Sequence, residues 1–306
     1  MNRVLLTIAV VLLTVVAARA EFRLCGRQVA DRSHHVPLPA DGQFDGHPDA
    51  PSAVWGRRID VTADGTPRDV QFCGGALIAR QWVLTARHCV DQKRWFDLRM
   101  VAGARNVGTP DTGAYRQGEA AFCPVDAMPG DLSQDIALVR LDRPVPMDAA
   151  VMPPVAPVDL IGLQRLDRGV VASWRWGDAG RLRAPLTLSP MTLTRGGGSG
   201  GSSFMVGSRV FLHRPAPCNG ESGSPVIVRL GRAQAVAGVL TAVFDPDNRG
   251  AGSDDDLGPV CGRANARVLI TPTWGFADWI ADTIADCDAD PPACLSRELT
   301  SPPREP

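Results

Sequence analysis

The chain has 306 residues, enough for one large or two small packed units. It is 44% hydrophobic and 21% charged, an ordinary globular composition that argues against wholesale disorder. The formal net charge of -1 argues against a nucleic-acid partner, which would favour a strongly basic surface.

The first twenty residues have the three parts of a secretory signal peptide. Met1-Asn2-Arg3 gives a short positive start, VLLTIAVVLLTVVA is an apolar run of suitable length, and Ala18-Arg19-Ala20 is an A-x-A cleavage site. The apolar run is too short for a comfortable membrane span. We therefore expect cleavage after Ala20 and a secreted or periplasmic protein, with an uncleaved membrane anchor as the alternative.

The next part of the chain divides into an extension and a strand-rich region. Residues 21–52 are rich in Pro, Asp, Gly and His and lack periodicity, which indicates an extended N-terminal segment. From Ala53 onward, Gly, Pro and Asp clusters separate short apolar or alternating runs: AVWGRRIDV, CGGALIA, QWVLTA, DLRMVAG, IALVRL, GVVASW, RVFLH, SPVIVRL and AVAGVLTAVF. This pattern predicts an all-β protein with many short strands.

Two polar segments interrupt the strand-rich region. RGGGSGGSS at 195–203 is a Gly/Ser loop, and DPDNRGAGSDDDLG at 245–258 is an acidic, Gly-containing loop. The carboxylates of residues 254–256 are of the type that calcium prefers, but the EF-hand spacing is absent. A solvated surface loop is the favoured interpretation of the acidic segment.

The C-terminal region carries the first helical periodicity. TWGFADWIADTIADC places Trp274, Ala277, Ile280 and Ile284 three and four residues apart, which predicts an amphipathic helix. The polar, Pro-rich residues from Leu295 onward are typical of a disordered tail.

The expected mature chain retains all eight cysteines, an even number that implies disulfides in an exported protein. Eight cysteines allow 105 pairings, so their number alone does not fix the connectivity. The chain contains no CxxC pair, which argues against a zinc site or a thioredoxin-type site.

Three separate motifs together suggest nucleophilic catalysis. Ser222 lies in CNGESGSPV, which by itself is equally typical of a Gly/Ser-rich turn. His88 follows a strand-like run in WVLTARHC, and Asp135 opens the apolar run DIALVRL, where a carboxylate needs a partner. No histidine follows Ser222, so the Ser-Asp-His chain order of α/β-hydrolases is excluded, and the order here is His-Asp-Ser.

With CGGALIARQWVLTARHC, DIALVRL and CNGESGSPV in this order, the chain resembles the chymotrypsin/trypsin-like serine proteases. The usual family forms are TAAHC, DIALL and GDSGGP, and the resemblance covers roughly residues 53–285. It implies an all-β fold of two six-stranded antiparallel β-barrels with a C-terminal helix and the site between the barrels.

The resemblance also implies residue roles. Ser222 would be the nucleophile, His88 the general base and Asp135 the residue that orients the imidazole. The backbone N–H groups of Gly220 and Ser222 would form the oxyanion hole. The residue matching Thr241 helps to orient the catalytic aspartate in the family, and a threonine hydroxyl could do so here.

Disulfide expectations follow in part from the same resemblance. Cys73–Cys89 matches the bridge at the histidine loop, and Cys218–Cys261 matches the bridge beside the nucleophile. Cys287 and Cys294 are close in sequence and would join the two sides of the C-terminal segment. Cys25 and Cys123 remain, and pairing them would connect the N-terminal segment to the first barrel.

The chain departs from the family around activation. Glu221 replaces the aspartate that pairs with a newly cut N-terminus, and no IVGG-like start is present. The Arg57-Arg58-Ile59 site is too close to Cys73 and is expected inside the first strand. The enzyme would then be active once the signal peptide is removed, or Glu221 would find another partner such as an arginine.

Other departures concern the site and the substrate pocket, which the resemblance assigns to Ala216, Thr241 and Val243. Ser224 gives GSPV, a feature of the bacterial glutamyl-endopeptidase branch, but Leu240 stands where that branch has its acid-recognising histidine. Arg87 replaces a small residue and is expected to reach solvent without a role. Ala216 stands where trypsin-like members have an aspartate, and Val243 where a glycine opens the pocket. We therefore expect no cleavage after Lys or Arg, and a preference for small apolar residues.

These observations predict a bacterial serine endopeptidase of the exported class. Its expected organisation is a signal peptide (1–20), an N-terminal extension (21–52), a protease domain (53–285) and a C-terminal tail (286–306). We expect a monomer that acts on polypeptides, requires no cofactor or metal, and binds neither nucleic acid nor membranes after signal removal. Two alternatives remain: a catalytically inactive, protease-like binding or scaffold protein, and an esterase with the same triad.

Overall fold

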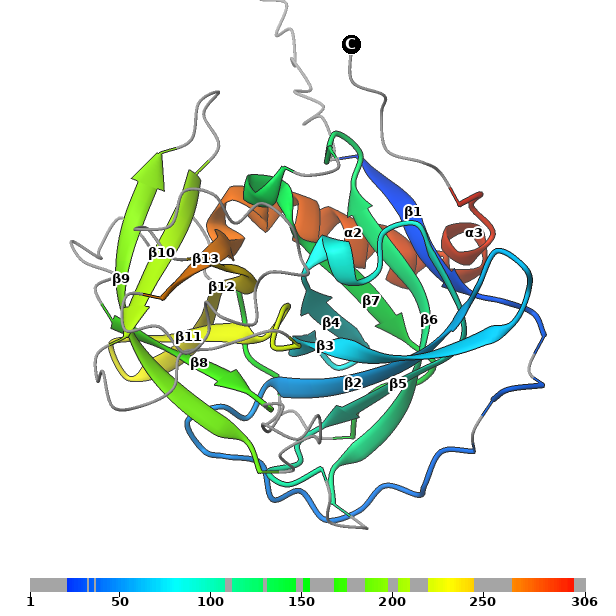
Figure 1. Cartoon of the computed structure of the whole chain (residues 1–306), viewed down its shortest axis with the longest axis horizontal. Coiled ribbons are helices and arrows are strands. Elements are labelled where there is room, and N and C mark those ends of the chain that lie inside the picture. Colours follow the sequence, from blue (N-terminus) through cyan, green and yellow to red (C-terminus); the bar gives the residue numbers. More distant parts are fainter. Residues whose placement is uncertain are drawn as a thin grey trace, which may run out of the picture.

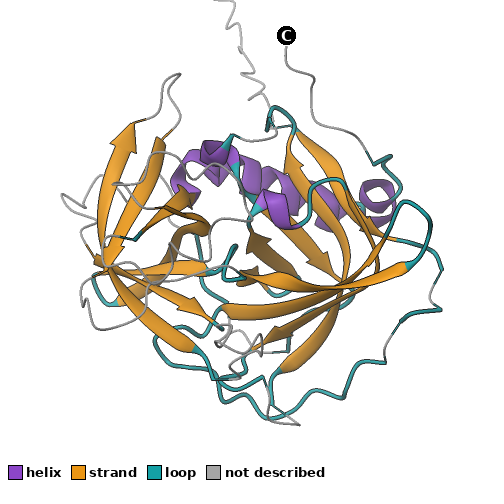
Figure 2. Cartoon of the chain, viewed as in Figure 1, coloured by secondary structure: helices purple, strands orange, loops and turns teal. Residues whose placement is uncertain are grey.

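The computed structural model describes residues 21–299, except 32, 36, 108–111, 129–130, 147–150, 155–167, 175–184, 198–202, 210–219 and 245–265. Within these ranges, the strands close into two barrels, and helices follow at the C-terminal end (Figures 1 and 2). The predicted all-β, double-barrel fold is confirmed. The expected signal peptide lies outside the described residues.

The first barrel contains a closed ring of six antiparallel strands in the order β2-β3-β4-β7-β6-β5. Its members are β2 (Ala53–Val61), β3 (Pro67–Ala79), β4 (Trp82–Thr85), β5 (Lys93–Ala102), β6 (Ala114–Pro124) and β7 (Ala137–Leu141). Strands β4 and β7 are buried along their whole length. They read as continuous apolar runs because residues such as Val83 and Val139 pack inside the barrel while Trp82 and Leu138 pack in the cluster that includes the C-terminal helix.

A seventh strand, β1 (Phe22–Gln28), joins this barrel where β5 and β6 separate. It pairs antiparallel with β6 and parallel with the start of β5. Residues 22–28 of the expected N-terminal extension thus form a strand of the first barrel, and the boundary of the protease domain at residue 53 stays a prediction. The strand lacks alternation because both of its faces are buried: Leu24 packs in one apolar cluster and Cys25 in the other.

The second barrel is a ring of six antiparallel strands in the order β8-β9-β10-β13-β12-β11. Its members are β8 (Arg168–Ser173), β9 (Thr187–Gly197), β10 (Ser203–Arg209), β11 (Pro225–Leu230), β12 (Ala233–Phe244) and β13 (Arg267–Pro272). Its core includes Val171, Val226, Leu240 and Ile270. Of the predicted Gly/Ser loop at 195–203, residues 195–197 belong instead to β9 and Ser203 to β10, while residues 198–202 lie outside the described part.

The chain ends in helices that pack on the first barrel. After the 3-10 turn η6 (Thr273–Phe276), helix α2 (Ala277–Ala289) buries Trp279, Ile280, Thr283 and Cys287, and α3 (Pro291–Leu295) follows. The Trp82 ring nitrogen donates to Asp288 at 3.0 Å. No helix within the described ranges is long and apolar enough to cross a membrane.

The expected disorder after Leu295 is wrong for the part that the structure describes. The Arg297 guanidinium lies 4.0 Å from the centre of the Phe22 ring and donates to the Phe22 carbonyl at 3.2 Å. A cation over an aromatic face is an attractive contact. The C-terminal segment therefore contacts the strand that begins the described chain.

Three disulfides join residues of the described part: Cys25–Cys123, Cys73–Cys89 and Cys287–Cys294. The first connects β1 to β6, and the second connects β3 to the turn that carries His88. Cys218 and Cys261 lie outside the described residues, as does the acidic segment 245–258.

The Arg57-Arg58-Ile59 segment lies in the middle of β2, hydrogen-bonded to β3 on one side and to β5 on the other. Arg58 is only 5% exposed and donates to the Cys89 carbonyl. A protease would have to open the first barrel to cut there, so this segment does not serve as an activation site in the folded chain.

Candidate active site

His88 lies in a single 3-10 turn, η1 (Arg87–Cys89), between β4 and β5. The turn is fixed on both sides, because Cys89 is bridged to Cys73 of β3 and its carbonyl accepts from Arg58 of β2. The His88 side chain is 45% exposed. A rigid backbone therefore presents an accessible imidazole.

Asp135 follows the 3-10 turn η2 (Leu132–Gln134), which Asp131 caps by accepting from the Ser133 N–H at 2.9 Å. The Asp135 side chain is 1% exposed. One carboxylate oxygen accepts from the His88 backbone N–H at 2.8 Å, and the other lies 2.7 Å from His88 Nδ1. Two contacts to one residue fix both the position and the rotation of the ring.

The carboxylate also determines the tautomer of His88. An ionised carboxylate can only accept hydrogen bonds, so the ring proton lies on Nδ1. The neutral ring then has a lone pair on Nε2, which faces away from Asp135. This is the arrangement that a general base requires.

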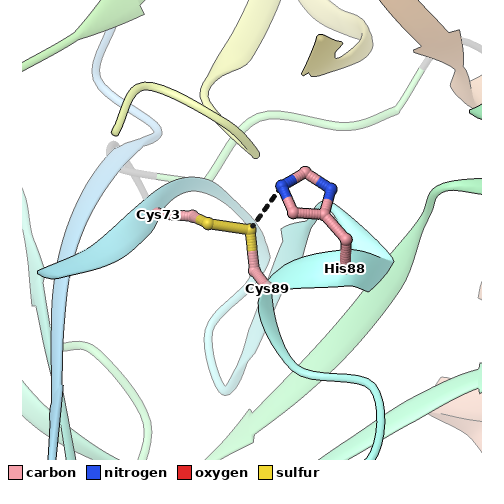
Figure 3. Close-up of side chains that lie close together, drawn as sticks. All are labelled: Cys73, His88 and Cys89. Carbon is pink, nitrogen blue, oxygen red and sulfur yellow. Dashed lines mark hydrogen bonds between the residues drawn. A yellow bond between two sulfur atoms is a disulfide. The ribbon is translucent and has the colours of Figure 1, made fainter. Parts of the chain in front are cut away.

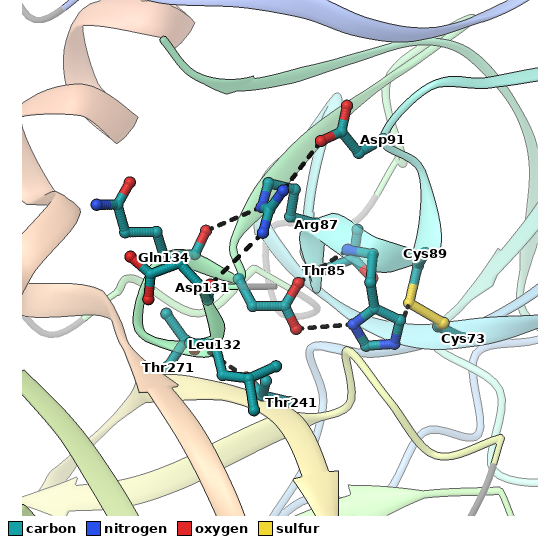
Figure 4. Close-up of polar contacts among 12 residues, drawn as sticks. Cys73, Thr85, Arg87, Cys89, Asp91, Asp131, Leu132, Gln134, Thr241 and Thr271 are labelled. Carbon is teal, nitrogen blue, oxygen red and sulfur yellow. Dashed lines mark hydrogen bonds and ion pairs between the residues drawn. A yellow bond between two sulfur atoms is a disulfide. The ribbon is translucent and has the colours of Figure 1, made fainter. Parts of the chain in front are cut away.

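Thr241 does not orient Asp135 directly, contrary to the expectation. Its hydroxyl pairs with the Thr271 hydroxyl at 2.8 Å, and the Thr271 hydroxyl donates to the Leu132 carbonyl at 2.9 Å (Figure 4). Because Thr271 has one hydroxyl proton and gives it to Leu132, Thr241 is the donor to Thr271. The second barrel thus reaches the segment before Asp135 through two threonines.

Ser222 lies in the turn before β11, against the first barrel. Its carbonyl accepts from the Gly74 N–H at 2.8 Å, and the next residue, Gly223, donates to the Leu240 carbonyl at 2.7 Å. The described contacts include no hydrogen bond between the Ser222 hydroxyl and His88. The structure therefore joins His88 and Asp135 directly, whereas the Ser222 turn is hydrogen-bonded to Gly74 of β3 and Leu240 of β12.

Small residues permit this close approach. Gly223 has φ +77°, and a Cβ on it would overlap Thr85 and the Gly74 carbonyl. A Cβ on Gly74 would overlap the hydroxyl of Ser224, which is 1% exposed. Ser224, the departure from the usual glycine, is accommodated because the facing residue has no side chain.

The residues before Ser222 have their own contacts. Glu221 is 1% exposed and accepts from the Ser173 hydroxyl at the end of β8, so at least part of its partner set differs from the expected arginine. Gly220 adopts φ +82°, a conformation that favours glycine. Both residues fix the backbone that leads to Ser222.

Arg87 is buried, which contradicts the expectation that it reaches solvent. Its side chain is 6% exposed and contacts Asp91 and the segment that leads to Asp135 (Figure 4). The sequence around Arg87 gives no sign that this residue is buried, because its hydrogen-bond partners lie 4 to 47 residues away along the chain. Together with Asp91 and Thr271, it is a site-supporting residue that the motifs do not identify.

The predicted pocket residues are only partly described. Ala216 lies outside the described residues. Thr241 and Val243, both in β12, are 3% and 5% exposed, and Val243 belongs to the apolar core of the second barrel. Their side chains face packed surroundings in this structure.

His88 Nε2 lies 3.6 Å from the sulfur of Cys89 (Figure 3). Cys73, His88 and Cys89 thus bring three potential ligand atoms together, as do Cys25, Asp91 and Cys123. In both groups the two sulfurs form a disulfide and are not thiolates, the form that binds zinc. Neither group has the chemistry of a metal centre.

The family model described as Trypsin matches residues 45–280. The chain is 28% identical to granzyme M of Homo sapiens over 189 residues, which cover 57% of this chain and 73% of that protein. It is 27% identical to snake venom serine protease BITS01A of Bothrops insularis over 228 residues, covering 70% and 78%. It is 33% identical to brachyurin of Leptuca pugilator over 121 residues, covering 36% and 46%. The bacterial source and the glutamyl-endopeptidase features remain predictions.

Proposed function

We propose that His88, Asp135 and Ser222 form the catalytic triad of this chain, which belongs to the trypsin family and is a serine-type endopeptidase. The observation that carries the proposal is the double contact of the buried Asp135 carboxylate with the His88 backbone and ring. A buried carboxylate needs partners. Here both partners belong to a half-exposed histidine beside the Ser222 turn.

In the proposed reaction, the Ser222 hydroxyl attacks the peptide carbonyl while His88 Nε2 takes its proton. The tetrahedral intermediate collapses as His88 gives that proton to the leaving amine, and water then hydrolyses the acyl-enzyme by the same route. Asp135 holds Nδ1–H and stabilises the imidazolium. The N–H groups of Gly220 and Ser222 would bind the oxyanion, each worth roughly 3–4 kcal/mol in the transition state.

For the substrate, we propose a preference for small apolar residues before the cleaved bond. Ala216 supplies no negative charge for Lys or Arg, and Val243 adds volume where the family often has glycine. Chromogenic peptides ending in Ala, Leu, Glu or Arg test this preference, and a dominant Arg or Glu signal would contradict it.

We also propose that the chain is exported and that residues 1–20 are removed. The three disulfides among the described residues support an oxidising compartment. Intact mass of the secreted protein tests this, since cleavage after Ala20 gives a chain that begins at Glu21.

The described contacts include no hydrogen bond between the Ser222 hydroxyl and His88. In proteases without substrate, this bond is often long and tightens in the complex. Activity measurements have to show that the triad is assembled, and a well-folded protein without activity would be a protease-like binding protein.

Peptide hydrolysis by the wild type, Ser222→Ala and the matched variant Ser296→Ala tests the proposal. Ser296 is exposed near the C-terminal end, so its loss should leave activity unchanged. We expect activity to disappear in Ser222→Ala alone. Equal activity in all three proteins would show that the hydrolysis does not depend on Ser222, and activity in none would support the binding protein.

A further inference from the structure

We propose that Arg87 is a positioning residue that holds the Asp135 segment against the His88 turn, and that Arg23 of β1 fixes Arg87 through Asp91. The inference rests on the proposed triad and deepens it. It assigns a role in the site to a residue beside the histidine and to β1, the strand that pairs with β5 and β6.

The Arg87 side chain joins the two loops that carry His88 and Asp135. Its Nη2 donates to the Met128 carbonyl at 2.6 Å and lies 3.5 Å from the Asp131 carbonyl, and its Nε donates to the Gln134 carbonyl at 3.3 Å. Gln134 immediately precedes Asp135. Arg87 itself immediately precedes His88, and its own carbonyl accepts from the N–H groups of residues 90 and 91 within the turn.

The guanidinium is fixed from its other side by a carboxylate. Arg87 Nη1 donates to Asp91 Oδ2 at 3.1 Å. Arg23 donates to both oxygens of the same carboxylate, at 2.9 and 2.7 Å. The side chains of Arg23, Arg87 and Asp91 are only 4%, 6% and 9% exposed.

These contacts use chemistry that is specific to arginine. A guanidinium has a rigid, planar set of donors that can reach several acceptors at once, whereas an ammonium is a compact charge on a flexible stem. Lysine at position 87 would retain the charge but could not reproduce contacts to Asp91, Met128 and Gln134 together. The planar guanidinium of Arg87 therefore sets the distance between the loops of His88 and Asp135, which a positive charge alone would not do.

The expected consequence is catalytic because the His88–Asp135 contact depends on the relative position of the two loops. A displacement of about 1 Å at an active site can reduce the rate by about 100-fold. Disturbing Arg87 should therefore lower kcat with little effect on KM, since Arg87 acts through Asp135 and not on the bound peptide.

The test compares kcat and KM of the secreted protein with those of Arg87→Met and Arg87→Lys, with active sites titrated. Arg116→Met is the matched control: Arg116 is also buried, and donates to the Pro144 carbonyl and the Asp41 carboxylate, away from both catalytic loops. We expect kcat to fall about 10- to 100-fold in both Arg87 variants and by less than about twofold in the control. If Arg87→Met does not fold, Arg87→Lys decides by the same criterion.

A double-mutant cycle separates positioning from general stability. In an Asp135→Asn background, whose orientation is already lost, Arg87→Met should change kcat by less than about threefold. The proposal would be overturned if Arg87→Met lowered kcat by the same factor in both backgrounds. It would also be overturned if the Arg87 variant that folds kept kcat within twofold of the wild type. If Asp135→Asn itself leaves kcat unchanged, the triad fails; if it lowers kcat while the Arg87 variants do not, only the positioning role fails.

Arg23→Met tests the part assigned to β1. It leaves the contact between Arg87 and Asp91 in place, so we expect a smaller loss of kcat than in Arg87→Met, at least about threefold, with KM unchanged. Wild-type kcat in Arg23→Met would overturn the contribution of β1.

Discussion

The two barrels hold their parts of the site by different means. In the first barrel, the loops with His88 and Asp135 are fixed by a disulfide and by charged side chains that are almost fully buried. In the second, the Ser222 turn is fixed by backbone hydrogen bonds and by glycines whose missing side chains let it approach β3.

Because of this difference, the two barrels should be sensitive to different kinds of substitution. A charged network is specific in geometry but costly when one partner is lost, because the remaining charge stays buried. The Ser222 turn, in contrast, has no room for an added carbon atom on Gly223 or on the facing Gly74. Substitutions in the two barrels should therefore fail in different ways.

The largest effect tests whether the two barrels make one catalytic unit. His88→Ala and Ser222→Ala should each lower kcat by about 10⁶-fold, and the double variant should be no worse, because the residues act together. Steady-state hydrolysis of one peptide substrate by the three variants is the measurement. Additive losses would indicate two independent contributions.

The close approach of the Ser222 turn predicts the next effect. Gly223→Ala should lower kcat by about 100-fold, because the new Cβ would push the turn away from Thr85 and Gly74. Gly231→Ala is the control, since Gly231 also has positive φ, +64°, but no atom lies within 4 Å of the added Cβ. The control should lose only about 1–2 kcal/mol of stability and retain its kcat. Equal kcat in the two variants would contradict a steric role for Gly223.

The contact of the second barrel with the Asp135 segment should matter less than Arg87. Thr271→Val removes the hydroxyl between Thr241 and Leu132 and leaves a buried donor without its partner, at a cost of about 1–3 kcal/mol. We expect kcat to fall less than tenfold. Thermal denaturation and steady-state kinetics check both values, and a larger loss of kcat than in Arg87→Met would reverse the assignment.

The smallest effect concerns a pair in the first barrel that is distant from the site. Hydrogen bonding from Arg116 lowers the pKa of Asp41 below its ordinary value of 3.8. The pair therefore contributes stability above pH 3.8, and this contribution is lost as the pH falls through the lowered pKa. Asp41→Asn should cost less than about 1 kcal/mol at pH 6 and progressively less as the pH falls through the lowered pKa, measured by urea denaturation at a series of pH values. An equal cost at every pH value would contradict the ionic origin.

Sequence patterns predicted the architecture where strands have regular burial or clear turn signals. The run AVWGRRIDV matches β2 from its first to its last residue. The patterns failed for β1, whose two buried faces remove the alternation, and for the chain after Leu295, whose contact with Phe22 joins the two ends of the described chain. Such long-range contacts leave no local signal.

His88 and Asp135, which the motifs single out, are in contact in the structure, but the residues that support them could not be predicted. Burial of Arg87 depends on Asp91 and on carbonyls of a loop more than forty residues away. Ser224 is compatible with the fold because Gly74 faces it, a pairing that only the packed structure reveals.

Labelling of the secreted protein, which is expected to begin at Glu21, with a fluorophosphonate, read by intact mass beside Ser222→Ala, tests the assembled triad most directly. The account predicts one adduct per chain in the wild type and none in the variant, without prior proteolysis. A well-folded wild-type protein that takes up no label would contradict it.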